Sequence, residues 1–177
     1  MTACQPYQFK GTAYADPQPA PDFELTATDG QRFRLGEQRG QIVLLFFGYT
    51  SCPDVCAMTL AEARQVLQGL HEDADEVRFV FVTVDPERDT PQVLARYVSA
   101  FHPAILGLSG TPDELEAIRQ AYGVIAEKGM LEKSAAGYGV NHTARVFLVD
   151  RDGRLRLSYA FGTPPADIIQ DIHHLLG

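Results

Sequence analysis

The sequence predicts an α/β protein whose mixed central sheet is flanked by helices. Two continuous apolar runs, at 42–47 and 78–84, are typical of central strands that are covered on both faces. Segments with apolar residues at helical spacing alternate with these strands, as they do in α/β folds. The chain has 177 residues, of which 45% are hydrophobic. That size and composition suit one domain with a single sizeable core.

The first elements each have a local signal. Residues 1–20 combine prolines with small residues and are expected to form a flexible tail, so that the domain proper covers residues 21–177. A hairpin is expected at 23–26 and 32–35, because Asp29-Gly30 is a turn signal between them. After the strand at 42–47, apolar residues recur every three or four positions and predict a helix over about 53–70.

Helix-start signals punctuate the second half of the chain. Thr90-Pro91 opens a helix after the strand at 78–84, and Thr111 to Glu114 form a capping box ahead of a helix that runs to about Tyr122. A short strand is expected between them, at 105–108. Thr163-Pro164 is expected to cap the last helix, after a hairpin at 145–149 and 155–160.

Residues 123–141 show no clear period, and glycines interrupt them, so we expect a long loop; loops of this length are commonly functional or disordered. The chain order is therefore a hairpin, β-α-β-α, an inserted strand-helix-loop, and β-β-α. Without the N-terminal hairpin and the insertion, this is the thioredoxin-like arrangement.

Charge and composition exclude several classes of function. The net charge of −8 at pH 7 argues against a nucleic-acid-binding protein, which would carry a basic stripe. The chain has no apolar run of about 18 residues that would span a membrane and no visible secretory signal. Small residues precede Cys4, as they do at the cleavage site of bacterial lipoproteins. Two interpretations stay open: a chance cysteine in a tail, or the remnant of a lipid anchor.

The most informative motif is Cys52-Pro53-Asp54-Val55-Cys56, at the point where a strand turns into a helix. We expect Cys52 near the N-cap and Pro53 in the first helical position, where partial positive charge favours thiolates. Residues four apart on a helix have Cβ atoms about 5–6 Å apart, whereas a disulfide needs about 3.5–4.5 Å. The spacing therefore favours a metal such as Cu(I) or Zn(II), and predicts that any disulfide is strained and readily reduced.

A third ligand is needed, and His142 is the best candidate among five histidines. It ends the predicted loop just before the strand at 145–149, a junction that faces the cysteine helix in the thioredoxin arrangement. His71, His102, His173 and His174 are instead expected at helix ends and turns. Asp85 ends the strand at 78–84, where it is either a turn residue or a carboxylate that orients a ligand.

Three segments together resemble the Sco/SenC family of copper proteins, which help to assemble the Cu-A centre of cytochrome c oxidase. They are 48–56 (GYTSCPDVC), 84–91 (VDPERDTP) and 138–142 (YGVNH), and the resemblance extends from about Pro21 to the C-terminus. It implies one copper held by Cys52, Cys56 and His142, with Asp85 beside the site. Three ligands fit Cu(I), and Cu(II) could add a weak fourth. Ala57 and Asn141 depart from the common pattern of the family.

The resemblance also implies partners and a location. These are the oxidase subunit II, a copper donor protein, and the periplasmic or equivalent face of a membrane to which the N-terminus is anchored; the domain itself is expected to be a monomer. The leading hypothesis is a copper metallochaperone, which is not an enzyme in the usual sense. The alternative is a thiol-disulfide oxidoreductase in which Cys52 and Cys56 reduce the cysteines of the oxidase subunit. A peroxidase of the peroxiredoxin type shares the fold, but a cysteine pair with His142 does not suit it.

Overall fold

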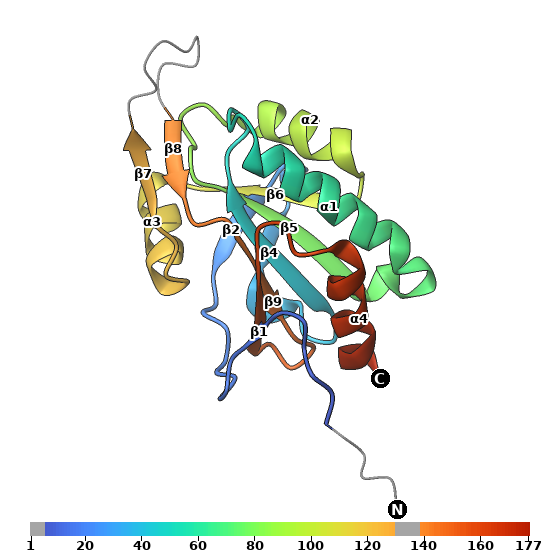
Figure 1. Cartoon of the computed structure of the whole chain (residues 1–177). Helices are drawn as coiled ribbons and strands as arrows, with labels where there is room; N and C mark the ends of the chain where they lie inside the picture. Colours follow the sequence, from blue (N-terminus) through green and yellow to red (C-terminus); the bar gives the residue numbers. More distant parts are fainter. Residues whose placement is uncertain (1–5, 130–138) are drawn as a thin grey trace, which may run out of the picture.

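An eight-stranded mixed sheet forms the centre of the protein, with helices on both of its faces (Figure 1). The computed structural model describes residues 6–129 and 139–177, except for the side chains of 127–129 and 139–142. The strands are β1 Thr12–Ala13, β2 Glu24–Ala27, β3 Arg32–Arg34, β4 Ile42–Gly48, β5 Val77–Thr83, β6 Ile105–Ser109, β7 Ala126–Gly129, β8 Gly139–His142, β9 Arg145–Val149 and β10 Leu155–Ala160. The α-helices are α1 Val55–Gly69, α2 Pro91–Phe101, α3 Pro112–Ala121 and α4 Pro165–Leu176, and short 3-10 helices cover Leu35–Glu37 and His71–Glu76.

The strand order is β1-β10-β9-β4-β5-β6-β2-β3, with β4 at the centre. β4 runs parallel to β5 and antiparallel to β9, and β5 runs parallel to β6. Every residue of β4 is buried, as its continuous apolar run predicts. The mixed sheet with flanking helices, the N-terminal hairpin and the inserted β6–α3 unit confirm the predicted fold class.

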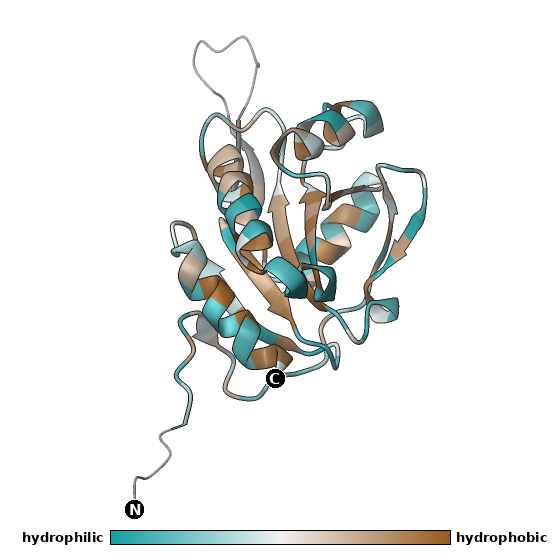
Figure 2. Cartoon of the chain, turned by 90° about the vertical axis from the view of Figure 1, so that its right-hand side faces the viewer, coloured by the Kyte–Doolittle hydropathy of each residue, from teal (hydrophilic) through white to brown (hydrophobic). Residues whose placement is uncertain are grey.

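Neighbouring aromatic residues of β4 show which helices cover which face. The Phe46 ring packs on Phe81 and that ring on Tyr97 of α2, with centroids 5.9 Å apart in both pairs. On the other face, Phe47 packs on Tyr122, just after α3, at 5.7 Å. Side chains of successive strand residues point to opposite faces, so α2 and the end of α3 cover opposite sides. Figure 2 shows central strands that are mostly hydrophobic, beside helices in which hydrophobic and hydrophilic residues are mixed.

The predicted helix starts are confirmed at α2 and α3. The Thr90 hydroxyl accepts a bond from the Val93 amide at 3.3 Å, and the Thr111–Glu114 capping box is complete. The prediction for α4 is wrong in detail. Pro164, which has no amide hydrogen, occupies the N-cap, while the Thr163 hydroxyl donates to the Ala160 carbonyl at 2.8 Å. The threonine therefore closes the preceding turn instead of capping the helix.

The expected long loop at 123–141 contains a second, two-stranded sheet, so the prediction is wrong for the parts that form β7 and β8. These strands pair antiparallel, with Ala126 opposite His142 and Gly129 opposite Gly139. Their glycine and charged residues lack the apolar alternation that identifies most strands. Residues 130–138 lie outside the described part of the chain.

Part of the segment expected as a tail belongs to the sheet. β1 pairs with β10, placing Thr12 opposite Ser158, and the buried Asp171 of α4 accepts bonds from the Lys10 and Gly11 amides at 2.9–3.0 Å. The sequence did not reveal this packing, because the bonds to Asp171 use backbone amides and only a few residues, such as Phe9, pack against the core. Residues 1–5 lie outside the described part.

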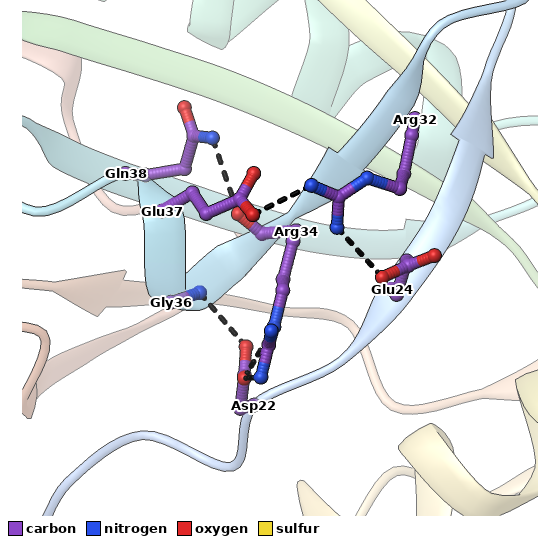
Figure 3. A network of polar contacts seen from close by, with 7 residues as sticks. All are labelled: Asp22, Glu24, Arg32, Arg34, Gly36, Glu37 and Gln38. Carbon is purple, nitrogen blue, oxygen red and sulfur yellow. Dashed lines mark hydrogen bonds and ion pairs between the residues drawn. The ribbon is translucent and has the colours of Figure 1, made fainter.

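The predicted N-terminal hairpin is confirmed as β2 and β3, which form one edge of the sheet. Figure 3 shows its surface network, in which Arg32 binds Glu24 and Glu37, and Arg34 binds Asp22. Exposed ion pairs of this kind contribute about 0–1 kcal/mol each. The network therefore secures the register of the edge more than it stabilises the core. Within the described ranges, the helices are too short or too polar to cross a membrane.

Candidate functional site

The predicted site residues come from one end of the central sheet. The register places Gly48, at the end of β4, beside Thr83, at the end of β5, and pairs Phe46 of β4 with Val146 at the start of β9. The cysteine segment follows β4, and Asp85 follows β5. His142 comes shortly before β9. Because adjacent strands lie about 4.8 Å apart, three connections that are distant in sequence meet at this end.

The cysteine motif is a turn followed by the helix, and this corrects the predicted start. Helix α1 begins at Val55, with Asp54 in the N-cap position, so Cys52 and Pro53 lie outside it. The Cys52 amide donates to the Tyr49 carbonyl at 3.3 Å, closing the turn. Proline often occupies the first position of a helix, but Pro53 lies in the turn that precedes α1. The two cysteines are therefore not held at helical spacing, and the strain predicted for a disulfide loses its geometric basis.

Cys52 and Cys56 do not form a disulfide in this structure. They lie close enough to share a hydrogen bond, yet they differ in exposure. Cys52 is partly exposed, whereas Cys56 is 0% exposed. A hydrogen bond with Cys52 and then burial raise the pKa of Cys56, while a bond from the Tyr49 amide lowers it in part. The expectation that the helix start favours a thiolate is therefore wrong for Cys56 in the metal-free dithiol. Burial and the neighbouring sulfur outweigh the helix dipole.

Gly48 allows Cys56 to approach the sheet. A Cβ atom at this position would lie 2.9 Å from the Cys56 Sγ and 2.9 Å from the Phe81 ring. Real Cβ atoms do not come this close to their neighbours, so the sulfur fills the space that a side chain would occupy. The glycine at the end of β4 therefore sets the depth at which Cys56 is buried.

Asp85 is buried and connects indirectly to the cysteine turn. Its side chain is 1% exposed and pairs with the Arg88 guanidinium at 2.5 Å. That guanidinium in turn lies over the Tyr49 ring, 5.6 Å from the centroid, in cation–π geometry. The Asp85 carbonyl also accepts bonds from the Arg88 and Asp89 amides at 3.2 and 3.0 Å, so Asp85 is a turn residue, but a buried one. That its carboxylate orients a ligand stays a prediction.

Asp89 was not identified as a site residue from the sequence. Asp89 is 1% exposed and accepts bonds from the Thr50 amide, the Thr50 hydroxyl and the Thr83 hydroxyl, at 2.6–3.3 Å. Burial raises the pKa of Asp89, while the bonds from Thr50 and Thr83 lower it in part. This carboxylate ties the segment before Cys52 to the end of β5. The only signal in the sequence was its place immediately before the N-cap Thr90.

His142 ends β8. Hydrogen bonds hold the next residue, Thr143, and the residue opposite His142 on β7, Ala126. The Thr143 amide donates to the Ile125 carbonyl at 3.0 Å, and the Ile125 amide donates to the Thr143 hydroxyl at 3.1 Å. The Ala126 carbonyl, opposite His142 in the register, accepts from Arg119 Nη1 of α3 at 2.9 Å. The side chain of His142 lies outside the described part, so its role as a ligand stays a prediction.

The other histidines lie elsewhere. His102 accepts a bond from the Ala104 amide, His173 lies 3.5 Å from Asp73, and His174 stacks on the Tyr7 ring at 3.9 Å. His174 is nevertheless exposed and lies in the last turn of α4, in agreement with the helix-end position expected for it. Among the described side chains, no group of three or more His, Cys, Asp or Glu residues could hold a metal ion. Cys4 falls outside the described residues.

Comparisons with known proteins bear on the whole domain. The profile of the SCO1/SenC family matches residues 12–177. An SCO2-like protein of Rickettsia prowazekii is 33% identical over 132 residues, which make up 75% of this chain and 64% of that protein. The copper-bound structure of ScoI from Bradyrhizobium japonicum is 38% identical, has a TM-score of 0.81, and matches over 90% of this chain and 100% of its own. The apo Sco1 protein from Thermus thermophilus is 40% identical, with a TM-score of 0.84, over 96% and 98% of the two chains.

Proposed function

The chain belongs to the SCO1/SenC family, and from this premise we propose that it binds one copper ion and delivers it to the Cu-A centre of cytochrome c oxidase. Cys52, Cys56 and His142 are the proposed ligands. The observation that carries the proposal is the position of the two cysteines. Their sulfurs are not joined in a disulfide and lie close enough to share a hydrogen bond. They lie at the end of the sheet where the connection that contains His142 leads into β9.

The chemistry of the donors supports copper. Soft thiolates with an imidazole suit Cu(I), and Cu(II) could take a further weak ligand. Two thiols are too few for a closed structural zinc site, which has four protein ligands. Copper is bound in the related Bradyrhizobium japonicum ScoI. A site with few ligands, one of them partly exposed, leaves the ion open to an incoming ligand, as release to a partner requires.

The difference in exposure between the thiols supports a second candidate, a thiol-disulfide oxidoreductase. The partly exposed Cys52 could attack a disulfide in a partner, and the buried Cys56 beside it could then resolve the mixed disulfide. In that role the partner's cysteines would be reduced while Cys52 and Cys56 become oxidised. His142 discriminates between the two candidates, because copper binding needs it and disulfide exchange does not.

The partners and location follow from the same proposal. We infer that a copper donor protein loads the domain and that the oxidase subunit II receives the ion. Both events would take place at the periplasmic or equivalent face of the membrane, with the domain acting as a monomer near an anchor. Anchoring would raise the effective concentration of the domain near the oxidase.

Competition for Cu(I) with a chelator tests the site. Purified wild type should bind one equivalent, and Cys52→Ser, Cys56→Ser and His142→Ala should each lose tight binding. His102→Ala is the matched control, because His102 lies at the far end of α2 from the cysteine turn. Stoichiometric Cu(I) retained by Cys56→Ser would refute the ligand assignment.

Complementation in cells separates the two functions. Cells without the protein should lose oxidase activity at low copper, and added copper should partly restore it. Both cysteine variants should fail to complement the loss under either function. If His142→Ala restores the oxidase fully, delivery of copper is excluded and the oxidoreductase function is favoured.

A further inference from the structure

The turn before Cys52 is held by one neighbouring segment, the connection that follows β5. The Thr50 amide and hydroxyl donate to the Asp89 carboxylate at 2.6–3.3 Å, although Asp89 lies 39 positions further along the chain. The Arg88 guanidinium lies over the Tyr49 ring, 5.6 Å from its centroid. The chain therefore cannot shift at Tyr49 or Thr50 without breaking contacts with this segment.

Contacts within the connection after β5 keep its own groups in place. The Thr83 hydroxyl donates to the Asp89 carboxylate at 2.6 Å and accepts a bond from the Asp85 amide at 3.0 Å. The Asp85 carboxylate pairs with Arg88 at 2.5 Å. Thr83, Asp85 and Asp89 are all buried, and hydrogen bonds removed from water are stronger than exposed ones. We call this set of contacts the turn clamp; it comprises Tyr49, Thr50, Thr83, Asp85, Arg88 and Asp89.

The turn clamp acts on one cysteine more than on the other. Cys56 lies in α1 and is 0% exposed, and its sulfur fills the space beside Gly48, so the core fixes its position. Cys52 precedes the helix and is partly exposed, and its amide donates to the Tyr49 carbonyl at 3.3 Å. The distance between the two sulfurs therefore depends on where the turn clamp holds Cys52.

We propose that Asp89 is a positioning residue that holds the Cys52 turn in its dithiol arrangement and thereby favours the dithiol over the disulfide. Cys52 and Cys56 are not joined in this structure. A disulfide bond is about 2.0 Å long, much shorter than the contact of two unbonded sulfurs. Oxidation must therefore draw Cys52 away from the position that the turn clamp favours. The same position presents two separate sulfurs to a metal ion. The copper part of this inference rests on the proposed function, whereas its redox part rests on the contacts alone.

Equilibration in glutathione buffers measures this preference directly. When the pair is oxidised, the bond between Cys52 and Cys56 forms and the bond of glutathione disulfide breaks, so that two electrons and two protons pass to two molecules of reduced glutathione. Losing one hydrogen bond of the turn clamp should raise the equilibrium constant for this reaction roughly 2- to 10-fold. Cu(I) affinity should fall by a similar factor, because the ion would bind a less pre-organised pair of sulfurs.

Thr50→Val is the first test variant, because valine keeps the branched shape of threonine and leaves the Asp89 charge in place. It should shift the equilibrium toward the disulfide, and Asp89→Asn should shift it further in the same direction. Asp171→Asn is the matched control. Asp171 of α4 is also buried and accepts bonds from the Lys10 and Gly11 amides and from two tyrosine hydroxyls, so this variant should lose stability in urea as Asp89→Asn does. Its redox equilibrium and Cu(I) affinity should stay those of wild type.

The outcomes separate this inference from the proposed function. If Asp171→Asn shifts the redox equilibrium as much as Asp89→Asn, a general loss of stability explains the shift and the positioning role is refuted. If Asp89→Asn shifts it but Thr50→Val does not, the charge of Asp89 acts instead of its bonds, which also refutes the role. If both clamp variants shift the equilibrium as expected while wild type does not bind Cu(I), the copper function fails and the positioning role stands.

Discussion

Replacing Gly48 by alanine should disturb the site through packing alone. The new Cβ would lie 2.9 Å from the Cys56 Sγ, 2.9 Å from the Phe81 ring and 3.0 Å from the Phe46 ring. Carbon atoms in contact are normally about 3.5–4.0 Å apart, so each neighbour would have to retreat by roughly 0.5–1 Å. The rings lie in a fully buried, close-packed core, and the sulfur is therefore the neighbour that can move into the turn.

The net cost follows from two opposing terms. Overpacking of a core costs about 1–3 kcal/mol, while removing a glycine from the unfolded chain returns about 0.4–1 kcal/mol. Gly48→Ala should therefore destabilise the protein by roughly 0.5–2 kcal/mol. Gly107→Ala is the matched control. Gly107 lies on β6, and its new Cβ would be equally crowded, at 2.9 Å from Leu94 and 2.9 Å from Thr28, but it would not contact the cysteines.

Three measurements on each variant are needed: urea unfolding of the reduced protein, the dithiol–disulfide equilibrium in glutathione buffers, and Cu(I) affinity. Both variants should lose similar stability. Only Gly48→Ala should shift the redox equilibrium and weaken copper binding, because only its Cβ displaces the Cys56 sulfur. The reasoning is refuted if Gly48→Ala keeps the redox equilibrium and affinity of wild type, or if Gly107→Ala changes them as much.

Other contacts give further predictions. Asp89→Asn should lose about 1–3 kcal/mol at neutral pH, because one amide oxygen replaces two carboxylate acceptors. Burial raises the pKa of Asp89, so the folded protein binds this proton more tightly than the unfolded chain does. The resulting stability is present at acid pH and is lost as pH rises. In urea unfolding, the difference in the free energy of unfolding between wild type and Asp89→Asn should therefore shrink from a pH of about 4 upward. Asp171→Asn should lower the pKa of Tyr7 from about 12, measured by phenolate absorbance; an unchanged titration would contradict the Tyr7–Asp171 bond as a cause. Arg119→Met removes the bond from the guanidinium to the Ala126 carbonyl, so hydrogen exchange of the amides around Ala126 should become faster. Cu(I) binding should weaken, while the cysteine redox equilibrium should stay unchanged. Unaltered exchange would mean that the guanidinium does not hold β7.

Local patterns were sufficient for much of the fold. The buried strands and the amphipathic helix after them follow from periods that are readable without any contact. The cap of α2 follows from Thr90 and its neighbours, because a cap bond closes within a few residues. Even the clustering of the predicted site residues at one sheet end could be anticipated, since it depends on chain order and strand direction. The prediction of a soft-metal or redox site followed from Cys52 and Cys56.

Contacts between distant segments decided the rest. The sequence around Asp89 is compatible with a solvated or a buried carboxylate. Asp89 is buried because the segment that contains Thr50, distant in sequence, folds against it and donates hydrogen bonds to it. β7 and β8 pair through backbone hydrogen bonds. Such bonds leave no signal in the sequence when apolar and polar residues do not alternate along the strands. The protonation of Cys56 depends on the depth that Gly48 permits and on the sulfur of Cys52. The sequence by itself determined the order of the central strands and the α-helices, and it placed two cysteines directly after β4. The tertiary structure alone determined the burial and hydrogen bonding of the two cysteine sulfurs, because desolvation and hydrogen bonds depend on neighbours that only folding brings together.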